Sequence, residues 1–169
     1  PVVTVQVKAR NDYMPATITL TKEKEVLSTD TDGSGMVHTS LIQVPGEGFV
    51  FGLYNLKPIA CATGDLAEDT LIATAVSDKA GTITFSGEFP HGSYYVKELS
   101  GPDGWQLSTE RHAITVSDEW KTEANELAIR VEEPIVNRLI HADVRVSKTD
   151  LTGSDYLPHT LIEVRNEKG

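Results

Sequence analysis

The chain has a single cysteine, Cys61, among its 169 residues. One cysteine excludes an intrachain disulfide, so a covalent staple within this chain would need another chemistry. Basic residues are also few: 15 Lys and Arg stand against 25 Asp and Glu, and the formal net charge is -10. This balance excludes a basic face that could neutralise the phosphates of nucleic acid or dock on anionic lipid.

Long apolar runs are missing as well. No stretch approaches the length of a membrane span, and no charged-then-apolar signal segment opens the chain, so we expect no membrane insertion in this fragment. The chain begins in strand-like sequence at Pro1–Val3, which indicates an excerpt of a longer protein. Hydrophobic residues still make up 39% of the chain, which is enough for a packed core and argues against general disorder.

Apolar and polar residues alternate with a period of two along much of the chain, and turn residues such as those of 101–104 interrupt the alternation. Strand-like runs are 3–7, 18–20, 49–53, Leu71–Ala75, Gly81–Phe85, Ser93–Leu99, His112–Val116, Glu126–Val131 and Asp143–Val146. No segment shows sustained helical periodicity, although 118–125 could form a helical turn. Many short strands at about ten-residue spacing predict an all-β sandwich.

An internal repeat organises the chain. Residues 10–22 align without a gap with residues 136–148, and an Asn and a Lys recur at the same offset (Asn11 with Asn137, Lys22 with Lys148). The spacing of the copies is that of an ordinary domain. We therefore expect residues 1–12 to be the closing strand of a preceding domain, 13–138 a complete sandwich, and 139–169 the opening strands of a following domain. Coincidence between two β-rich stretches is the alternative.

Three polar residues carry the candidate chemistry. Lys22 continues the inward parity of Ile18 and Leu20, which places an amine in the core. Glu98 shares a strand face with Val96, and Asn137 ends a strand-like stretch. An unpaired ammonium in an apolar core is expensive, so Lys22 should lose its proton or find a carboxylate. A plain buried Lys–Glu ion pair, with Asn137 a turn residue, is the simplest alternative.

Four stretches together resemble the collagen-adhesin B-type (CnaB-like, prealbumin-like) domains of Gram-positive adhesins and pilins. They are the lysine strand Ile18–Lys22, the aromatic strand Gly48–Tyr54, the segment Tyr94–Trp105 and the run Val136–Asp150. The third looks like the family's "E-box", Y-x-x-x-E-x-x-A-P-x-G-Y. It departs from that pattern with Gly101 for Ala and Trp105 for Tyr. The resemblance implies an immunoglobulin-like or prealbumin-like β-sandwich in a tandem domain array.

The resemblance also implies an intramolecular isopeptide bond between Lys22 and Asn137, with Glu98 as the proton shuttle. No cofactor or metal is implied, and the protein would not be an enzyme beyond this single-turnover self-crosslinking. Lys24 shares the parity of Lys22 and is the main rival nucleophile. Asn11 and Lys148 would be the equivalent residues of the flanking domains.

The expected function is that of a stalk or spacer module in an extracellular, cell-wall-attached adhesin or pilin, whose partners are neighbouring domains of the same chain. An alternative is a ligand-binding module that contacts a host matrix protein or carbohydrate. An enzyme accessory domain on a transthyretin-like sandwich is the third reading, and no convergent His or carboxylate pair supports it.

Other motifs fit known sites poorly. Residues 30–37 match the start of an EF-hand loop, but Leu41 stands where the bidentate Glu is required, so we expect a β-turn. Residues 157–160 resemble a cell-wall sorting signal without its glycine and apolar tail. The five histidines have no metal-ligand spacing. Trp105 and Trp120 are expected to pack in the core or at its edge rather than stack on sugars.

Overall fold

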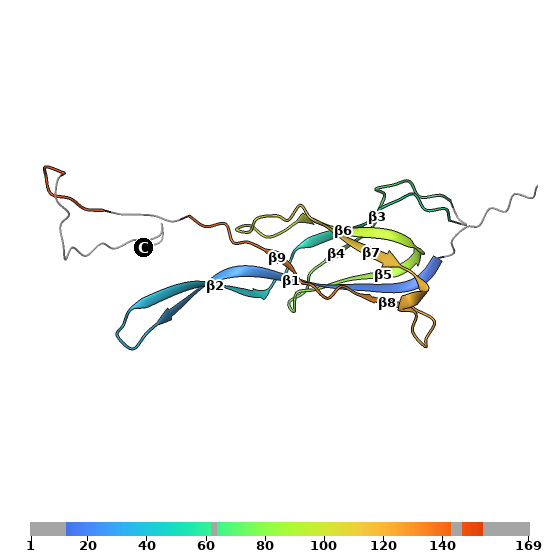
Figure 1. The fold of residues 1–169 in the computed structure, drawn as a ribbon, viewed down its shortest axis with the longest axis horizontal. Coiled ribbons are helices and arrows are strands. Elements are labelled where there is room, and N and C mark those ends of the chain that lie inside the picture. The colour runs from blue at the N-terminus through green and yellow to red at the C-terminus, as the bar shows by residue number, and fades with distance from the viewer. Residues whose placement is uncertain (1–12, 62–63, 143–146, 154–169) are drawn as a thin grey trace, which may run out of the picture.

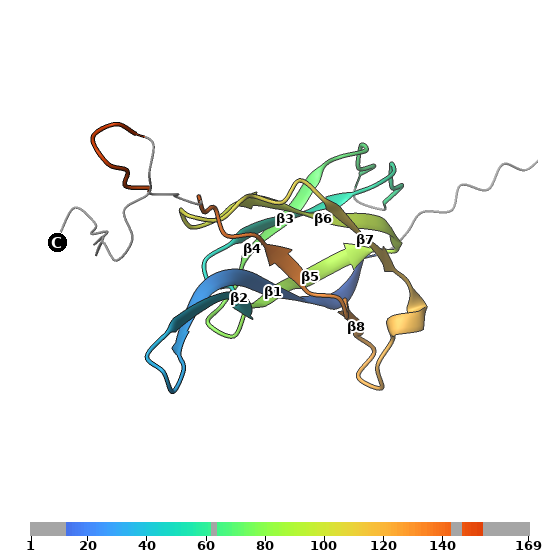
Figure 2. The ribbon, with the colours of Figure 1, turned by 60° about the vertical axis from the view of Figure 1, so that its left-hand side comes forward.

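The computed structural model describes residues 13–61, 64–142 and 147–153. They form two β-sheets that face each other, and Figure 2 shows β3, β6 and β7 in one layer above β1, β5 and β8 in the other. The strands are β1 (Tyr13–Thr31), β2 (Val37–Pro45), β3 (Val50–Asn55), β4 (Leu71–Val76), β5 (Thr82–Pro90), β6 (Gly92–Ser100), β7 (Arg111–Val116), β8 (Leu127–Arg130) and β9 (Ile135–Asn137). The predicted all-β sandwich is confirmed.

The predicted strands that lie within the described residues correspond to observed ones, with two differences. Residues 23–30 and 37–45 carry no clean apolar alternation, yet they extend β1 and form β2. The helical turn expected over 118–125 is a short 3₁₀ turn, η1 (Asp118–Trp120). Residues 1–12, the predicted strand Asp143–Val146 and the motif at 157–160 lie outside the described residues.

Strand β1 (Tyr13–Thr31) organises the first sheet. Its first part pairs antiparallel with β5 and parallel with β8, and its middle pairs parallel with β9. The second sheet has the order β4-β3-β6-β7. Strands β1 and β9, the first and last of the described strands, lie side by side and run in the same direction.

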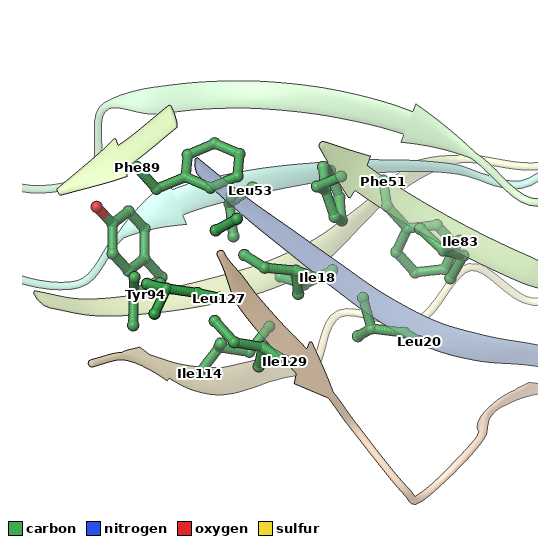
Figure 3. Packing of buried hydrophobic residues seen from close by; sticks show 14 of the residues in the cluster. Ile18, Leu20, Phe51, Leu53, Ile83, Phe89, Tyr94, Ile114, Leu127 and Ile129 are labelled. Carbon is green, nitrogen blue, oxygen red and sulfur yellow. The ribbon is translucent and has the colours of Figure 1, made fainter. Parts of the chain in front are cut away.

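The core lies between the two sheets, where side chains of alternate residues interdigitate (Figure 3). Ile18 and Leu20 of β1 pack there with residues of the facing sheet, such as Phe51 and Leu53 of β3. Leu127 and Ile129 of β8 extend the core at the edge. The period of two in the sequence therefore marks the buried faces.

The second half of β1 and β2 form a hairpin that projects beyond the sheets (Figure 1). At its tip, Asp32 Oδ1 accepts hydrogen bonds from the backbone of Ser34 and Met36 at 2.9 and 3.1 Å. Gly35 follows with φ of 85°, a conformation that glycine adopts readily. The stretch is thus a turn, as predicted, and the described residues contain no group of three or more possible metal ligands.

The two tryptophans differ. Trp105 is half-buried and packs against the core, as expected, whereas Trp120 in η1 is 38% exposed. Cys61 is buried in the core. Within the described part of the chain, no helix is long and apolar enough to cross a membrane.

Candidate cross-link site

The structure brings Lys22, Glu98 and Asn137 together from three different strands, β1, β6 and β9. Their exposed fractions are 0%, 2% and 1%, so all three are buried polar residues. For Lys22 this follows from the strand period, since it lies two residues beyond Leu20 on the inward face of β1. Glu98 and Asn137 reach the same space from the facing sheet and from the last strand.

Asn137 and Glu98 are in direct contact. The amide nitrogen Nδ2 of Asn137 donates to Glu98 Oε1 at 2.7 Å, and the backbone N–H of Ser108 donates to Glu98 Oε2 at 3.3 Å. The carbonyl oxygen Oδ1 of Asn137 is buried and accepts no hydrogen bond from the residues that the structure describes. A buried acceptor without a donor is costly, so the amide carbonyl is an unsatisfied group in the centre of the site.

Two backbone carbonyls and an aromatic ring hold the Lys22 amine in the site. Its Nζ donates to the carbonyl oxygens of Glu23 at 2.6 Å and of Ile135 at 2.9 Å. The ring of Phe49 lies beneath it, with its centroid 4.4 Å from Nζ. Ile135 lies two residues before Asn137 on β9, so this hydrogen bond ties the amine to the strand that carries the amide.

Burial shifts the protonation of both titratable groups toward the neutral form. It lowers the pKa of Lys22 to about 8, against the opposing charges of Glu98 and Glu23. It also raises the pKa of Glu98, against the hydrogen bonds from Asn137 and Ser108 and the charge of Lys22. Among the described residues, the two groups form no direct ion pair within 4.0 Å. Burial therefore increases the fraction of neutral amine and of neutral carboxyl beside the carboxamide.

The rival lysine, Lys24, lies on the same face of β1 and is the Cα partner of Asn137 in the β1–β9 register. Its side chain is only half-buried, and its Nζ lies 4.2 Å from the centroid of the Trp105 ring. Backbone register therefore brings Lys24 opposite Asn137, while its amine lies on an aromatic face.

Glycines surround the site because neighbouring groups leave no room for a side chain. A Cβ on Gly46 would lie 2.9 Å from Lys22 Cγ, and one on Gly101 would lie 2.5 Å from a carbon of the Phe49 ring. Gly101 is the position where the E-box pattern has Ala, so the close approach of Phe49 accounts for the departure. Phe49 and Ser108 were not predicted as site residues, since nothing in their local sequence signals contact with Lys22 or Glu98.

Of the two proposed flanking equivalents, Lys148 is exposed, and Asn11 lies outside the described residues. The domain boundaries expected at 12/13 and 138/139 remain a prediction.

Comparison with known proteins identifies the fold family. The model of the SpaA prealbumin-like fold domain matches residues 42–128, which is more than half of the chain. The prealbumin-like fold that the resemblance implied is therefore confirmed. A search of curated proteins finds none that matches.

Solved structures with a similar fold include three pilins. The minor pilin GBS52 of Streptococcus agalactiae is 20% identical with a TM-score of 0.46, and the match covers 80% of this chain and 49% of that one. The major pilin SpaD of Corynebacterium diphtheriae is 17% identical (TM-score 0.45; 80% and 32% covered). The T6 backbone pilin of Streptococcus pyogenes is 15% identical (TM-score 0.46; 75% and 35% covered). The chain thus spans half or less of each of these pilins.

Proposed function

Since the chain belongs to the family of SpaA prealbumin-like fold domains, we propose that it is a stalk or spacer module of a cell-surface adhesin or pilin. An autocatalytic isopeptide bond between Lys22 and Asn137 would stabilise it. One observation supports the bond above all: an amine, a carboxyl and a carboxamide from three strands are buried in one site, with the carboxyl on the nitrogen that must leave.

The reaction would begin from the neutral amine and the neutral carboxyl, whose populations burial increases. Lys22 Nζ attacks Asn137 Cγ, a new N–C bond forms, and the carbonyl electron pair moves to Oδ1. Glu98 then gives its proton to Nδ2, with which it is already in contact at 2.7 Å. The Cγ–Nδ2 bond breaks, ammonia leaves, and the carbonyl re-forms. Glu98 recovers a proton from Nζ, so the carboxyl is unchanged at the end.

Folding places the amine, the carboxyl and the carboxamide in one site, where they can react once. Reacting groups held in one site can reach effective molarities of about 10⁵–10⁸ M, so a weak nucleophile and a poor leaving group can react without a cofactor. The hydrogen bond from Lys22 to the Ile135 carbonyl and the packing of Phe49 restrict the amine to the site. The products are an amide and one free ammonia.

The proposed bond joins the two strands through which tension along the chain would enter and leave the sandwich. Tension that enters at the start of β1 and leaves after β9 would shear these two parallel strands. A covalent link from Lys22 to Asn137 would carry that tension past the residues between them, so the sandwich would not have to unfold. If 13–138 is one complete domain in a row of domains on a cell wall, its neighbours would pull on it at these two ends.

Intact mass spectrometry of the folded protein tests the proposal. We expect a mass lower than that of the sequence by one ammonia, and a peptide in which Lys22 is joined to Asn137. Lys22→Leu, Asn137→Ala and Glu98→Gln should restore the full mass, whereas Lys24→Ala should not. Asn137→Asp should react with loss of water in place of ammonia. A folded wild-type protein of full mass overturns the proposed bond.

A further inference from the structure

Two lysines of β1 compete for one asparagine, and backbone register does not favour the one expected to react. In the parallel β1–β9 pair, Lys24 lies opposite Asn137, whereas Lys22 lies opposite Ile135. Both lysines point to the same face of the strand, because they are two residues apart. Something other than the backbone must therefore decide which amine reaches Asn137.

Trp105 lies next to both Lys24 and the chain that follows Asn137, so it can influence which amine reaches the asparagine. The segment 104–106 pairs with the chain that leaves β9: Gln106 N donates to Arg138 O at 2.9 Å, and Ile140 N donates to Gly104 O at 2.8 Å. The indole Nε1 of Trp105 donates to the Glu25 carbonyl at 2.6 Å. Trp105 is thus fixed to β1 just after Lys24, and its backbone is fixed to the chain just after Asn137.

The Trp105 ring holds the Lys24 amine. Lys24 Nζ lies 4.2 Å from the ring centroid, within the range of a cation–π interaction, for which tryptophan is the best partner. The same ring packs edge-on against Phe49, with centroids 6.3 Å apart and planes at 72°. Phe49 in turn lies under the Lys22 amine. Two touching aromatic rings therefore hold the two amines separately.

We propose that Trp105 is a specificity-determining residue that directs the cross-link to Lys22 by holding Lys24 on its indole face. Trp105 is a positioning residue that acts through Lys24. The inference rests on the proposed cross-link, and it adds which lysine is used and why. The reaction that it prevents is attack of Lys24 Nζ on Asn137 Cγ, with release of the same ammonia.

The experiment compares the products of four variants by intact mass and peptide mapping. At a fixed time after folding, Lys22→Leu alone should be mostly of full mass, because Lys24 stays on the indole. Lys22→Leu with Trp105→Leu should form the Lys24–Asn137 peptide at a rate roughly tenfold higher than Lys22→Leu does, as loss of a cation–π contact predicts. Lys22→Leu with Trp105→Phe keeps an aromatic face and should stay close to Lys22→Leu. Lys22→Leu with Trp120→Leu removes the exposed tryptophan of η1 as the matched control.

A second measurement does not depend on cross-linking. In Trp105→Leu with Lys22 intact, the rate at which an amine-acylating reagent labels Lys24 should rise about fivefold, as release from a contact of this class predicts. In Trp120→Leu this rate should be unchanged. If Trp105→Leu leaves the labelling of Lys24 unchanged, the holding contact is refuted even where the double variant does not fold.

The failures of the two proposals can be distinguished. A wild-type protein of full mass refutes the cross-link, while Lys24 labelling still reports on Trp105. A wild-type protein linked through Lys22, combined with equal Lys24 cross-link in Lys22→Leu with and without Trp105, refutes the role of Trp105 alone. Circular dichroism and thermal melts establish that each variant compared is folded.

Discussion

The two halves of β1 belong to one continuous strand but have opposite environments. From Ala16 to Lys22, alternate residues are buried under the facing sheet, and β5 and β8 pair with this part of the strand on its two edges. From Glu23 to Thr31, no residue is fully buried, and Leu27 is 58% exposed. Lys22 is the last buried residue of the strand.

The difference shows that the length of a strand and the extent of its burial have separate causes. The second half pairs with β2 along its length, so backbone hydrogen bonds and the β-propensity of its Thr and Val residues maintain it without a core. The first half is held by burial on one face and neighbours on both edges. The proposed cross-link starts from Lys22, where the buried part of β1 ends. Its contribution to stability should therefore differ between the two halves of the strand.

The largest effect should come from removal of the cross-link. Asn137→Ala cannot form the bond, and a link that closes a loop of about 100 residues is worth ~4–5 kcal/mol on the chain-entropy model. We expect the free energy of unfolding to fall by about that amount in denaturant titrations. Lys24→Ala is the control and should leave the cross-linked fraction unchanged. Equal stability of Asn137→Ala and wild type would show that no bond contributes.

Truncation of one leucine in each half should separate core from hairpin. Leu20→Ala creates a cavity between the sheets and should destabilise the protein by about 2–5 kcal/mol. Leu27→Ala removes an exposed side chain and should change stability by about 0.5 kcal/mol or less. Each substitution is made in the Asn137→Ala variant, which cannot form the cross-link, and urea titrations measure the two changes in the free energy of unfolding. Similar losses at both positions would contradict the division of β1 into two regions.

The pH dependence of stability should reveal the unreacted amine. In Asn137→Ala, Lys22 stays a buried amine, and burial lowers its pKa from 10.5 to about 8. Between these values the unfolded chain binds more protons than the folded one, so the free energy of unfolding should rise with pH in this window. Wild type should lack the rise, because an amide nitrogen does not titrate there. Urea titrations across the window measure both slopes, and equal slopes would contradict an amide at Lys22.

Two glycine turns, one beside each half of β1, should differ in how much a side chain destabilises them. Gly81 has φ of 75°, and a Cβ there would collide with the Lys22 carbonyl oxygen, so Gly81→Ala should destabilise by roughly 2–3 kcal/mol. Gly35, at the hairpin tip, has φ of 85° but open space around it, so Gly35→Ala should lose only about 1 kcal/mol. Thermal melts compare the two. A larger loss at Gly35 would show that the hairpin is more strongly coupled to the core than its exposure indicates.

The parts of the fold that could be predicted are those where alternation reports burial. Ile18, Leu20 and Lys22 were assigned to one inward face from their spacing, and they lie there. The hairpin was missed beyond its turn because its strands are exposed on both faces, so no apolar period marks them. Exposed residues such as Thr29 and Thr39 are partners in its backbone register.

The candidate site could be named in part. Parity and resemblance point to Lys22, Glu98 and Asn137, and the bond itself stays a prediction. The packing of Phe49 under the amine and the hydrogen bond from Ser108 to Glu98 could not be foreseen. Both contacts join residues distant in the chain, and no local pattern records which loop closes over which strand.

By itself, the sequence determined that the chain is an all-β sandwich with the Lys22 amine on its inward face, because strand parity assigns side chains to faces; Asn137 was named through the family resemblance. Only the tertiary structure decided that β9 pairs in register with Lys24 opposite Asn137, and that Trp105 lies over that lysine. Register and ring placement depend on contacts between segments far apart in the chain, and the free energy of those contacts exists only after the sheets have assembled.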